Sequence, residues 1–152
     1  MGLDQYIYEV NPDVDLTEDY YEHLGEKVED EDGCVYYDES GILSDILYLR
    51  KVNFVQGYMD RLCQEKVGHE LGNCEYLIFD DGDLKKFLDV CNEVLECRSE
   101  SVALDLLPPE RGCFYGSYEI DECYWYDLEE VVKELSGYVG CDDRKYAYYA
   151  WW

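Results

Sequence analysis

Apolar and polar side chains alternate at both ends of the chain, which is the pattern of half-buried β-strands. In residues 3–10 (LDQYIYEV), Tyr6, Tyr8 and Val10 share one side of the predicted strand. Residues 145–152 (KYAYYAWW) predict a terminal strand, which we expect to dock on the fold because it is rich in aromatic residues. Both ends of the chain are therefore predicted to belong to a sheet.

Four internal segments also favour strands. CEYLIF (74–79) is the clearest buried strand, because its apolar run is short and is followed by the turn sequence DDGD. DILYL (45–49) predicts a strand that leads directly into a helix. CVYYD (34–38) gives a weaker strand signal, and CFYGSYEI (113–120) predicts a strand after the chain break LLPPERG.

Three segments show the three-to-four residue spacing of amphipathic helices. The first runs from about Lys51 to Lys66. The second is predicted to begin with Asp83 as its N-cap and to continue through Glu96. The third follows Asp121, also a predicted N-cap, and ends near Leu135. The apolar stripes of the three predicted helices are Val52, Val55, Met59 and Leu62; Leu84, Phe87, Leu88, Cys91 and Leu95; and Tyr124, Leu128, Val131 and Leu135.

These elements predict an α+β fold: a single compact domain over residues 1–152, with about three main helices packed on a small mixed or antiparallel sheet. One segment, residues 11–33, departs from the pattern as an acidic excursion. Within it we expect Thr17 to cap a short helix that Gly25 terminates, and the remainder to form a loop.

The net charge of the chain restricts the possible classes of function more than any sequence motif does. The chain has 37 acidic and 12 basic residues, a formal net charge of −25. Residues 1–49 contain 15 of the acids and one base, Lys27. Nucleic acid binding depends on cationic groups that displace counterions, so direct binding to nucleic acid is excluded, and an anionic membrane surface is disfavoured. A basic partner surface is favoured instead.

The eight cysteines do not predict a disulfide framework, because the sequence begins without the features of a signal peptide. We expect them to be reduced and mostly buried. No apolar run approaches the ~18 residues that a membrane span requires.

Specific cofactor chemistry is not predicted. The acid-rich segments 13–19, 30–33 and 80–83 lack the ligand spacing of an EF-hand. No Cys-x2-Cys pair occurs, and the spacing of Cys63, His69 and Cys74 does not match common zinc knuckles. We therefore expect no metal and no cofactor.

Enzymatic catalysis is disfavoured for similar reasons. His23 and His69 are the only histidines available to activate a cysteine nucleophile, and no cysteine motif accompanies them. Glycine-rich phosphate-binding signatures are absent. In the segment DECYWYDLEE (121–130), nothing buries one carboxylate apart from the others, as an acid–base pair requires.

Four stretches together resemble a family of small acidic proteins encoded by phages and prophages. They are MGLDQYIY (1–8), YLRKVNFVQGYM (48–59), LLPPERGCFYGS (106–117) with the acidic helix that follows, and the tail YAYYAWW (146–152). The family patterns are MGLDMYLY, YWRKANxIHxWF, LLPTxxGFFFGS and a tail that ends in tryptophan. The resemblance implies a phage setting and no particular activity.

The chain departs from the family in the second motif. Gln56 stands where the family has histidine, and Leu49 where it has an aromatic residue. Any chemistry that needs this imidazole is therefore missing here. Arg50, Lys51 and Asn53 match the family, and we expect Arg50 or Lys51 to pair with a partly buried carboxylate.

The sequence thus predicts a non-enzymatic inhibitor of a host defence system, of the anti-CRISPR or anti-restriction type, in the cytoplasm of a bacterial host cell. Its acidic surface would mimic nucleic acid and occupy the basic channel of a nuclease or another nucleic-acid-binding protein. A small accessory enzyme or ligand-binding protein, and a soluble structural or assembly protein, stay open as alternatives. The predicted partner-binding residues are Asp13, Asp15, Glu18, Asp19, Glu22, Glu26, Glu29, Asp30, Glu31, Asp32, Tyr20, Tyr21, Tyr126, Asp127, Glu130 and Glu134.

Overall fold

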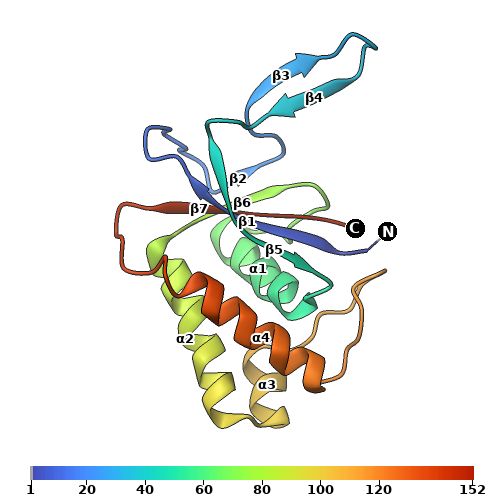
Figure 1. The fold of residues 1–152 in the computed structure, drawn as a ribbon, viewed down its shortest axis with the longest axis vertical. Coiled ribbons are helices and arrows are strands. Elements are labelled where there is room, and N and C mark those ends of the chain that lie inside the picture. The colour runs from blue at the N-terminus through green and yellow to red at the C-terminus, as the bar shows by residue number, and fades with distance from the viewer. Residues whose placement is uncertain (1) are drawn as a thin grey trace.

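The computed structural model describes residues 2–152 and has an α+β fold, as the sequence predicts (Figure 1). A five-stranded antiparallel sheet lies in the middle, four helices lie on one side of it, and a two-stranded hairpin projects on the other. The elements in chain order are β1 (Asp4–Val10), β2 (Tyr20–Tyr21), β3 (Glu26–Glu29), β4 (Val35–Asp38), β5 (Leu43–Arg50), α1 (Asn53–Lys66), β6 (Tyr76–Asp80), α2 (Asp81–Cys97), α3 (Glu100–Leu106), α4 (Glu122–Leu135) and β7 (Lys145–Trp151).

The strand order in the sheet is β2-β6-β7-β1-β5, so the two terminal strands of the chain pair with each other at its centre. Strand β1 also pairs with β5, and the acidic excursion is the connection between them. The excursion is longer than predicted: it includes β4 and runs to the start of β5. In the register of the sheet, Tyr6 of β1 lies opposite both Tyr48 of β5 and Tyr149 of β7.

Alternation along the strands separates two apolar clusters. Side chains such as Ile7, Phe79 and Tyr148 face the helices and join the main core with Phe54 and Phe87. Residues at the alternate positions belong to a second, smaller cluster on the opposite face. Because Leu16 and Leu24 of the excursion pack into this second cluster, the excursion is tied to the sheet at these points.

The three main predicted helices are correct apart from their boundaries. Helix α2 begins three residues earlier than expected, because Asp80 rather than Asp83 is its N-cap and accepts a hydrogen bond from the Asp83 amide. The Asp83 side chain accepts in return from the Asp80 amide, which completes a capping box. Asp121 caps α4 as predicted, accepting from the amides of Cys123 and Tyr124.

Two predicted elements are wrong. The helix between Thr17 and Gly25 is absent, because Tyr20 and Tyr21 pair as a short edge strand with β6. A helix of so few residues has little stability of its own, so pairing with the sheet decides the conformation. The strand at 113–120 is absent as well. Phe114 and Gly116 have φ angles of 67° and 93°, which no strand residue adopts.

Polar residues of the segment 48–59 have structural roles. The Asn53 side chain donates hydrogen bonds to the carbonyls of Tyr115 (3.2 Å) and Ser117 (2.6 Å), and these bonds fix the loop before α4. The Nε atom of Arg50 lies 3.9 Å from a carboxylate oxygen of Asp4, which is buried. The predicted pairing of Arg50 with a partly buried carboxylate is therefore confirmed.

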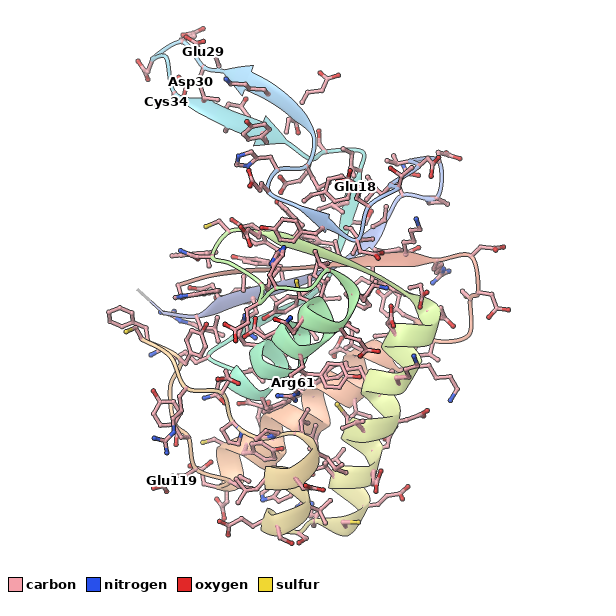
Figure 2. All side chains as sticks on the ribbon, turned by 180° about the vertical axis from the view of Figure 1, so that it is seen from behind. Glu18, Glu29, Asp30, Cys34, Arg61 and Glu119 are labelled. Carbon is pink, nitrogen blue, oxygen red and sulfur yellow. The ribbon has the colours of Figure 1, made fainter. Side chains whose placement is uncertain are left out.

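The positions of the cysteines contradict the prediction that most of them are buried. All eight are free, but only Cys63 and Cys91 are buried, and five are exposed. Cys34, for example, lies at the tip of the projecting hairpin (Figure 2). Most of the cysteines were expected to be core residues, and that prediction is wrong.

A chain of hydrogen bonds crosses the core between the sheet and α1. Gln5 of β1 donates to the Val52 carbonyl (3.1 Å) and to the hydroxyl of Tyr148 (2.9 Å). Tyr148 donates to the side-chain oxygen of Gln56 (2.7 Å), and the Gln56 amide donates to Asp60 (2.9 Å). Buried polar groups are stable only when hydrogen-bonded, so these side chains depend on one another. The chain ends at a carboxyl group on the surface of α1.

Candidate functional site: an acidic hairpin and a tyrosine face

The hairpin β3–β4 projects from the body of the protein and carries the densest group of acids (Figures 1 and 2). Asp30 orders its tip: its carboxylate accepts hydrogen bonds from the amides of Asp32 (3.0 Å) and Cys34 (2.8 Å). Gly33, with φ of 81°, completes the turn. The carboxylates at the tip are therefore held on a defined hairpin.

Close packing fixes the base of the hairpin. Gly25 has φ of 93° and lies so near β4 that a Cβ atom on it would be 2.0 Å from the Asp38 carbonyl oxygen. The ring of His23 stacks on Tyr37 with centroids 4.1 Å apart. Leu24, between these contacts, is buried in the second cluster. The hairpin is consequently joined to the sheet by packing as well as by the chain.

All ten predicted acids between Asp13 and Asp32 are exposed. Among residues 2–152, only one of them has an ion pair: the Asp19 carboxylate lies 3.7 Å from Lys66. The other nine form no ion pair within this described part of the chain, and Lys27 is the only base in the excursion. The excursion therefore presents almost all of its negative charge to solvent.

The structure does not bring the predicted α4 residues to this surface. Helix α4 lies on the helical side of the sheet, whereas the hairpin lies on the other (Figure 1). Glu130 and Glu134 lie 3.4 and 3.6 Å from Lys133, and Tyr126 is exposed. Asp127 is half-buried, and burial, followed by the nearby Asp121, raises its carboxyl pKa.

The charged residues Lys133 and Glu129 of α4 have different ion-pair partners. Lys133 pairs with Glu130 and Glu134 and not with Glu129, which lies four residues before it. Glu129 pairs with Arg98, which lies just after α2. Glu129 therefore links α4 to the end of α2.

Tyr20 and Tyr21 are less available than predicted. Both are half-buried in β2, and Tyr20 meets the edge of His69 with ring centroids 4.6 Å apart. The hydroxyl of Tyr21 accepts a hydrogen bond from the Glu18 amide (3.0 Å). The two rings fasten the acidic loop to the sheet edge.

A row of tyrosines, which sequence reasoning missed, crosses the face of the sheet opposite the helices. The register aligns one tyrosine from each of the five strands. Ring centroids are 5.2 Å apart between Tyr48 and Tyr6, and 4.6 Å apart between Tyr149 and Tyr76. Tyr48 at one end is 53% exposed, and so the row opens to solvent there. The row consists of Tyr48, Tyr6, Tyr149, Tyr76 and Tyr21.

The row meets the base of the hairpin at a small cavity of about 270 Å³. His23, Tyr37 and Glu39 line it on the side of the excursion, and Tyr76 and Tyr149 line it on the side of the sheet. Burial, followed by the negative charge of Glu39, raises the pKa of Tyr76. This tyrosine therefore stays neutral at physiological pH, with its hydroxyl donating to Glu39 (3.4 Å).

Two further exposed side chains on the hairpin were not predicted to bind a partner. Val35 is 50% and Tyr36 is 51% exposed, in the strand that pairs with the acidic β3. Apolar and aromatic groups among charges are typical of interface anchors. Their only sequence signal was the weak strand pattern of residues 34–38.

Arg50 and Asn53 line a cavity of about 200 Å³ together with Asp127. The Asn53 amide is already used by the loop carbonyls described above. Within residues 2–152 no group of three or more histidine, cysteine or acidic side chains is arranged to bind a metal ion. No helix in this part of the chain is long and apolar enough to cross a membrane.

Asp60, where the buried hydrogen-bond chain ends, has an unusual carboxyl group. Burial raises its pKa to about 7, and the negative charges of Glu110 and Glu70 add to the increase. The hydrogen bond from Gln56, which is the second-largest effect, and the positive charge of Arg61 oppose it. The ordinary value is 3.8, so between these two pH values the folded state keeps a proton that the unfolded state releases. Stability from this group is therefore present at low pH and is lost as the pH rises toward 7.

We expect Asp60→Asn to remove this pH dependence. At pH 8 the variant should be more stable than the wild type by about 2 kcal/mol, a value reduced from the full shift because water reaches the half-buried side chain. At pH 4 both side chains are neutral, and the two proteins should unfold at the same urea concentration. Urea unfolding at several pH values measures this. A constant difference across the range would contradict the raised pKa.

No protein-family model matches the chain, and neither a curated protein nor a solved structure shows detectable similarity to it. The functional interpretation therefore rests on the residues and geometry of this protein.

Proposed function

We propose that the protein binds a basic, nucleic-acid-binding surface of another protein and occupies it in place of nucleic acid. The observation that supports this most is the ordered, projecting hairpin, whose exposed carboxylates form no ion pair with any of the residues 2–152. Self-repulsion of this charge costs stability, and a cationic partner would relieve it. Binding requires no catalytic group.

The shape of the hairpin is suited to insertion into the nucleic-acid-binding groove of a partner protein. Duplex DNA presents one negative charge per ~1.7 Å of its axis, and a groove that binds DNA carries a matching field of Lys and Arg. A narrow hairpin with acids on both strands can enter such a groove further than a flat surface. Attraction of this kind is long-range, fast and weakened by salt. Val35 and Tyr36 would then supply apolar contact area at the interface.

The resemblance to phage-encoded proteins supplies the setting for the proposal. Phages gain when host enzymes that bind foreign nucleic acid are blocked, and an anionic protein is one physical means of blocking them. The proposed target is a defence nuclease in the cytoplasm of a bacterial host, such as a CRISPR effector or a restriction enzyme. The role is that of a non-enzymatic inhibitor.

The proposal is tested by measuring binding to candidate nucleases that are either free or loaded with their nucleic acid, at two salt concentrations. We expect binding to the free nuclease only, with affinity falling at least tenfold between about 50 and 200 mM salt. Equal binding to the loaded nuclease, or an affinity indifferent to salt, would argue against occupation of the nucleic-acid channel.

A further inference from the structure

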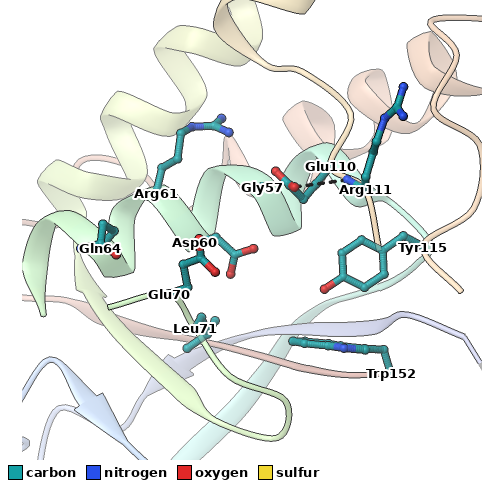
Figure 3. Close-up of a pocket in the computed structure, with 10 residues that line it drawn as sticks. All are labelled: Gly57, Asp60, Arg61, Gln64, Glu70, Leu71, Glu110, Arg111, Tyr115 and Trp152. Carbon is teal, nitrogen blue, oxygen red and sulfur yellow. Dashed lines mark hydrogen bonds between the residues drawn. The ribbon is translucent and has the colours of Figure 1, made fainter. Parts of the chain in front are cut away.

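A cavity of about 380 Å³ lies beside α1, on the helical side of the sheet and away from the hairpin (Figure 3). Gly57 and Asp60 lie on one face of the helix, one turn apart, and form one wall. Because Gly57 has no side chain, the Glu110 carboxylate lies close to the helix there: a Cβ atom would be 2.9 Å from its Oε2 atom. The other lining residues include Arg61, Glu70, Leu71, Arg111, Tyr115 and Trp152.

The acidic and basic side chains around this cavity differ in the direction in which they point. The carboxylates of Asp60 and Glu70 point into it, whereas the guanidinium groups of Arg61 and Arg111 point away (Figure 3). Each arginine lies over a tyrosine ring outside the lining: Arg61 at 5.9 Å from Tyr58, and Arg111 at 5.4 Å from Tyr118. Arg61 and Arg111 also line the cavity, and the Nη1 atom of Arg61 would lie 3.4 Å from a Cβ atom on Gly57. The three carboxylates that line the cavity therefore outnumber the two arginines, and none of the three forms an ion pair within the described residues.

Aromatic rings form the opposite wall, and backbone contacts hold them in place. Tyr115 and Trp152 meet edge to face, with ring centroids 5.5 Å apart. Asn73 accepts a hydrogen bond from the Trp152 amide (2.9 Å) and donates one to its carbonyl (3.1 Å). Aromatic faces opposite carboxylates attract organic cations, because the faces are electron-rich and the carboxylates accept N–H hydrogen bonds.

Asp60 gives the cavity a positioned acceptor. Gln56 is the one hydrogen-bond donor to Asp60 within the described chain, at 2.9 Å from Oδ1. Gln56 is in turn fixed by the fully buried Tyr148. The Oδ2 atom accepts no hydrogen bond from the described residues, so a ligand N–H group that reaches it would find an acceptor already oriented.

From these contacts we infer that the cavity binds an organic cation with N–H donors, an alkylguanidinium or alkylammonium group, between the carboxylates of Asp60, Glu70 and Glu110 and the rings of Tyr115 and Trp152. An organic cation fits better than a metal ion, because the carboxylates are not grouped closely enough to coordinate one and one wall is aromatic. The inference goes beyond the docking function and does not depend on it. The cation is a free small molecule or an arginine side chain of another protein.

The test uses three probes at pH 8, where Asp60 is ionised: butylguanidine, its neutral isostere butylurea, and the tripeptide acetyl-Gly-Arg-Gly-amide. The indole N–H signal of Trp152, assigned with Trp152→Phe, reports binding in NMR titrations. We expect butylguanidine to shift this signal in a saturable manner and butylurea to leave it unchanged. Tighter binding of butylguanidine than of the tripeptide identifies a small-molecule site, and the reverse order identifies a site for a protein arginine.

Asp60→Asn keeps the shape of the side chain and its acceptor for Gln56 but removes the charge. We expect it to weaken butylguanidine binding at least tenfold, whereas Asp105→Asn, an exposed change on α3, leaves the affinity unchanged. Glu70→Gln, at an exposed position, is a second variant that tests the same cavity, with an expected loss of at least threefold. Equal binding of butylurea, full affinity in Asp60→Asn or Glu70→Gln, or an unmoved Trp152 signal would overturn the inference.

Discussion

Replacing Tyr148 by phenylalanine is expected to lower the free energy of unfolding by about 3 kcal/mol. Tyr148 is fully buried, and its hydroxyl joins Gln5 to Gln56 in the core. Without the hydroxyl, a donor of Gln5 and an acceptor of Gln56 lose their partner away from water, at about 1–3 kcal/mol each. The loss should be visible in urea unfolding at pH 7 followed by tryptophan fluorescence, as a lower midpoint with an unchanged slope.

Tyr126→Phe provides the matched control, because this tyrosine is 63% exposed and its hydroxyl bonds to no other residue among 2–152. Its effect should stay within about 0.5 kcal/mol. Similar losses for the two variants would mean that the hydrogen bonds between β1, β7 and α1 contribute little to stability, contrary to the role described for them.

Neutralising the hairpin is expected to weaken binding to the basic partner about 100-fold at low salt. The variant combines Glu26→Gln, Glu29→Gln, Glu31→Gln and Asp32→Asn, all exposed positions on or beside β3. Asp30 is kept, because its carboxylate orders the tip through the amides of Asp32 and Cys34. Four charges at roughly 0.7 kcal/mol each correspond to this change in affinity.

A second variant distinguishes the effect of where the charges lie from the effect of the net charge of the protein. It carries Glu93→Gln, Glu96→Gln, Asp105→Asn and Glu119→Gln, which remove the same charge from exposed sites on the helical side. We expect it to bind within about threefold of the wild type. Isothermal titration at 50 mM salt compares the proteins. Equal losses in both variants would indicate that only net charge matters, and no loss in either would favour a protein whose acidity serves solubility alone.

Local pattern predicts most of this fold. The strands around Tyr6 and Tyr148 and the helices around Met59, Leu88 and Leu128 follow from the spacing of their apolar residues. The failures occur where other interactions decide. Phe114 is held in a left-handed conformation within a loop that Asn53 fixes through hydrogen bonds, and no local pattern shows a contact between residues so distant in sequence.

The candidate site was predictable in part. The density of acids between Asp13 and Asp32 marks the surface directly, and their exposure follows from the cost of burying charge. The tyrosine row requires the strand order and the register, because Tyr21 and Tyr48 come from opposite edges of the sheet. The separation of α4 from the hairpin, and the burial of Asp60, are likewise properties of the tertiary structure alone.

The central claim, that the acidic hairpin takes the place of nucleic acid on a basic protein, is tested most directly by displacement. A fluorescent duplex bound to the target nuclease is titrated with the wild-type protein, the hairpin variant and the variant with its changes on the helical side. The account predicts full displacement by the wild type, a midpoint that rises in proportion to duplex concentration, and about 100-fold weaker displacement by the hairpin variant alone. A ternary complex that keeps the duplex bound, or equal displacement by all three proteins, would contradict it.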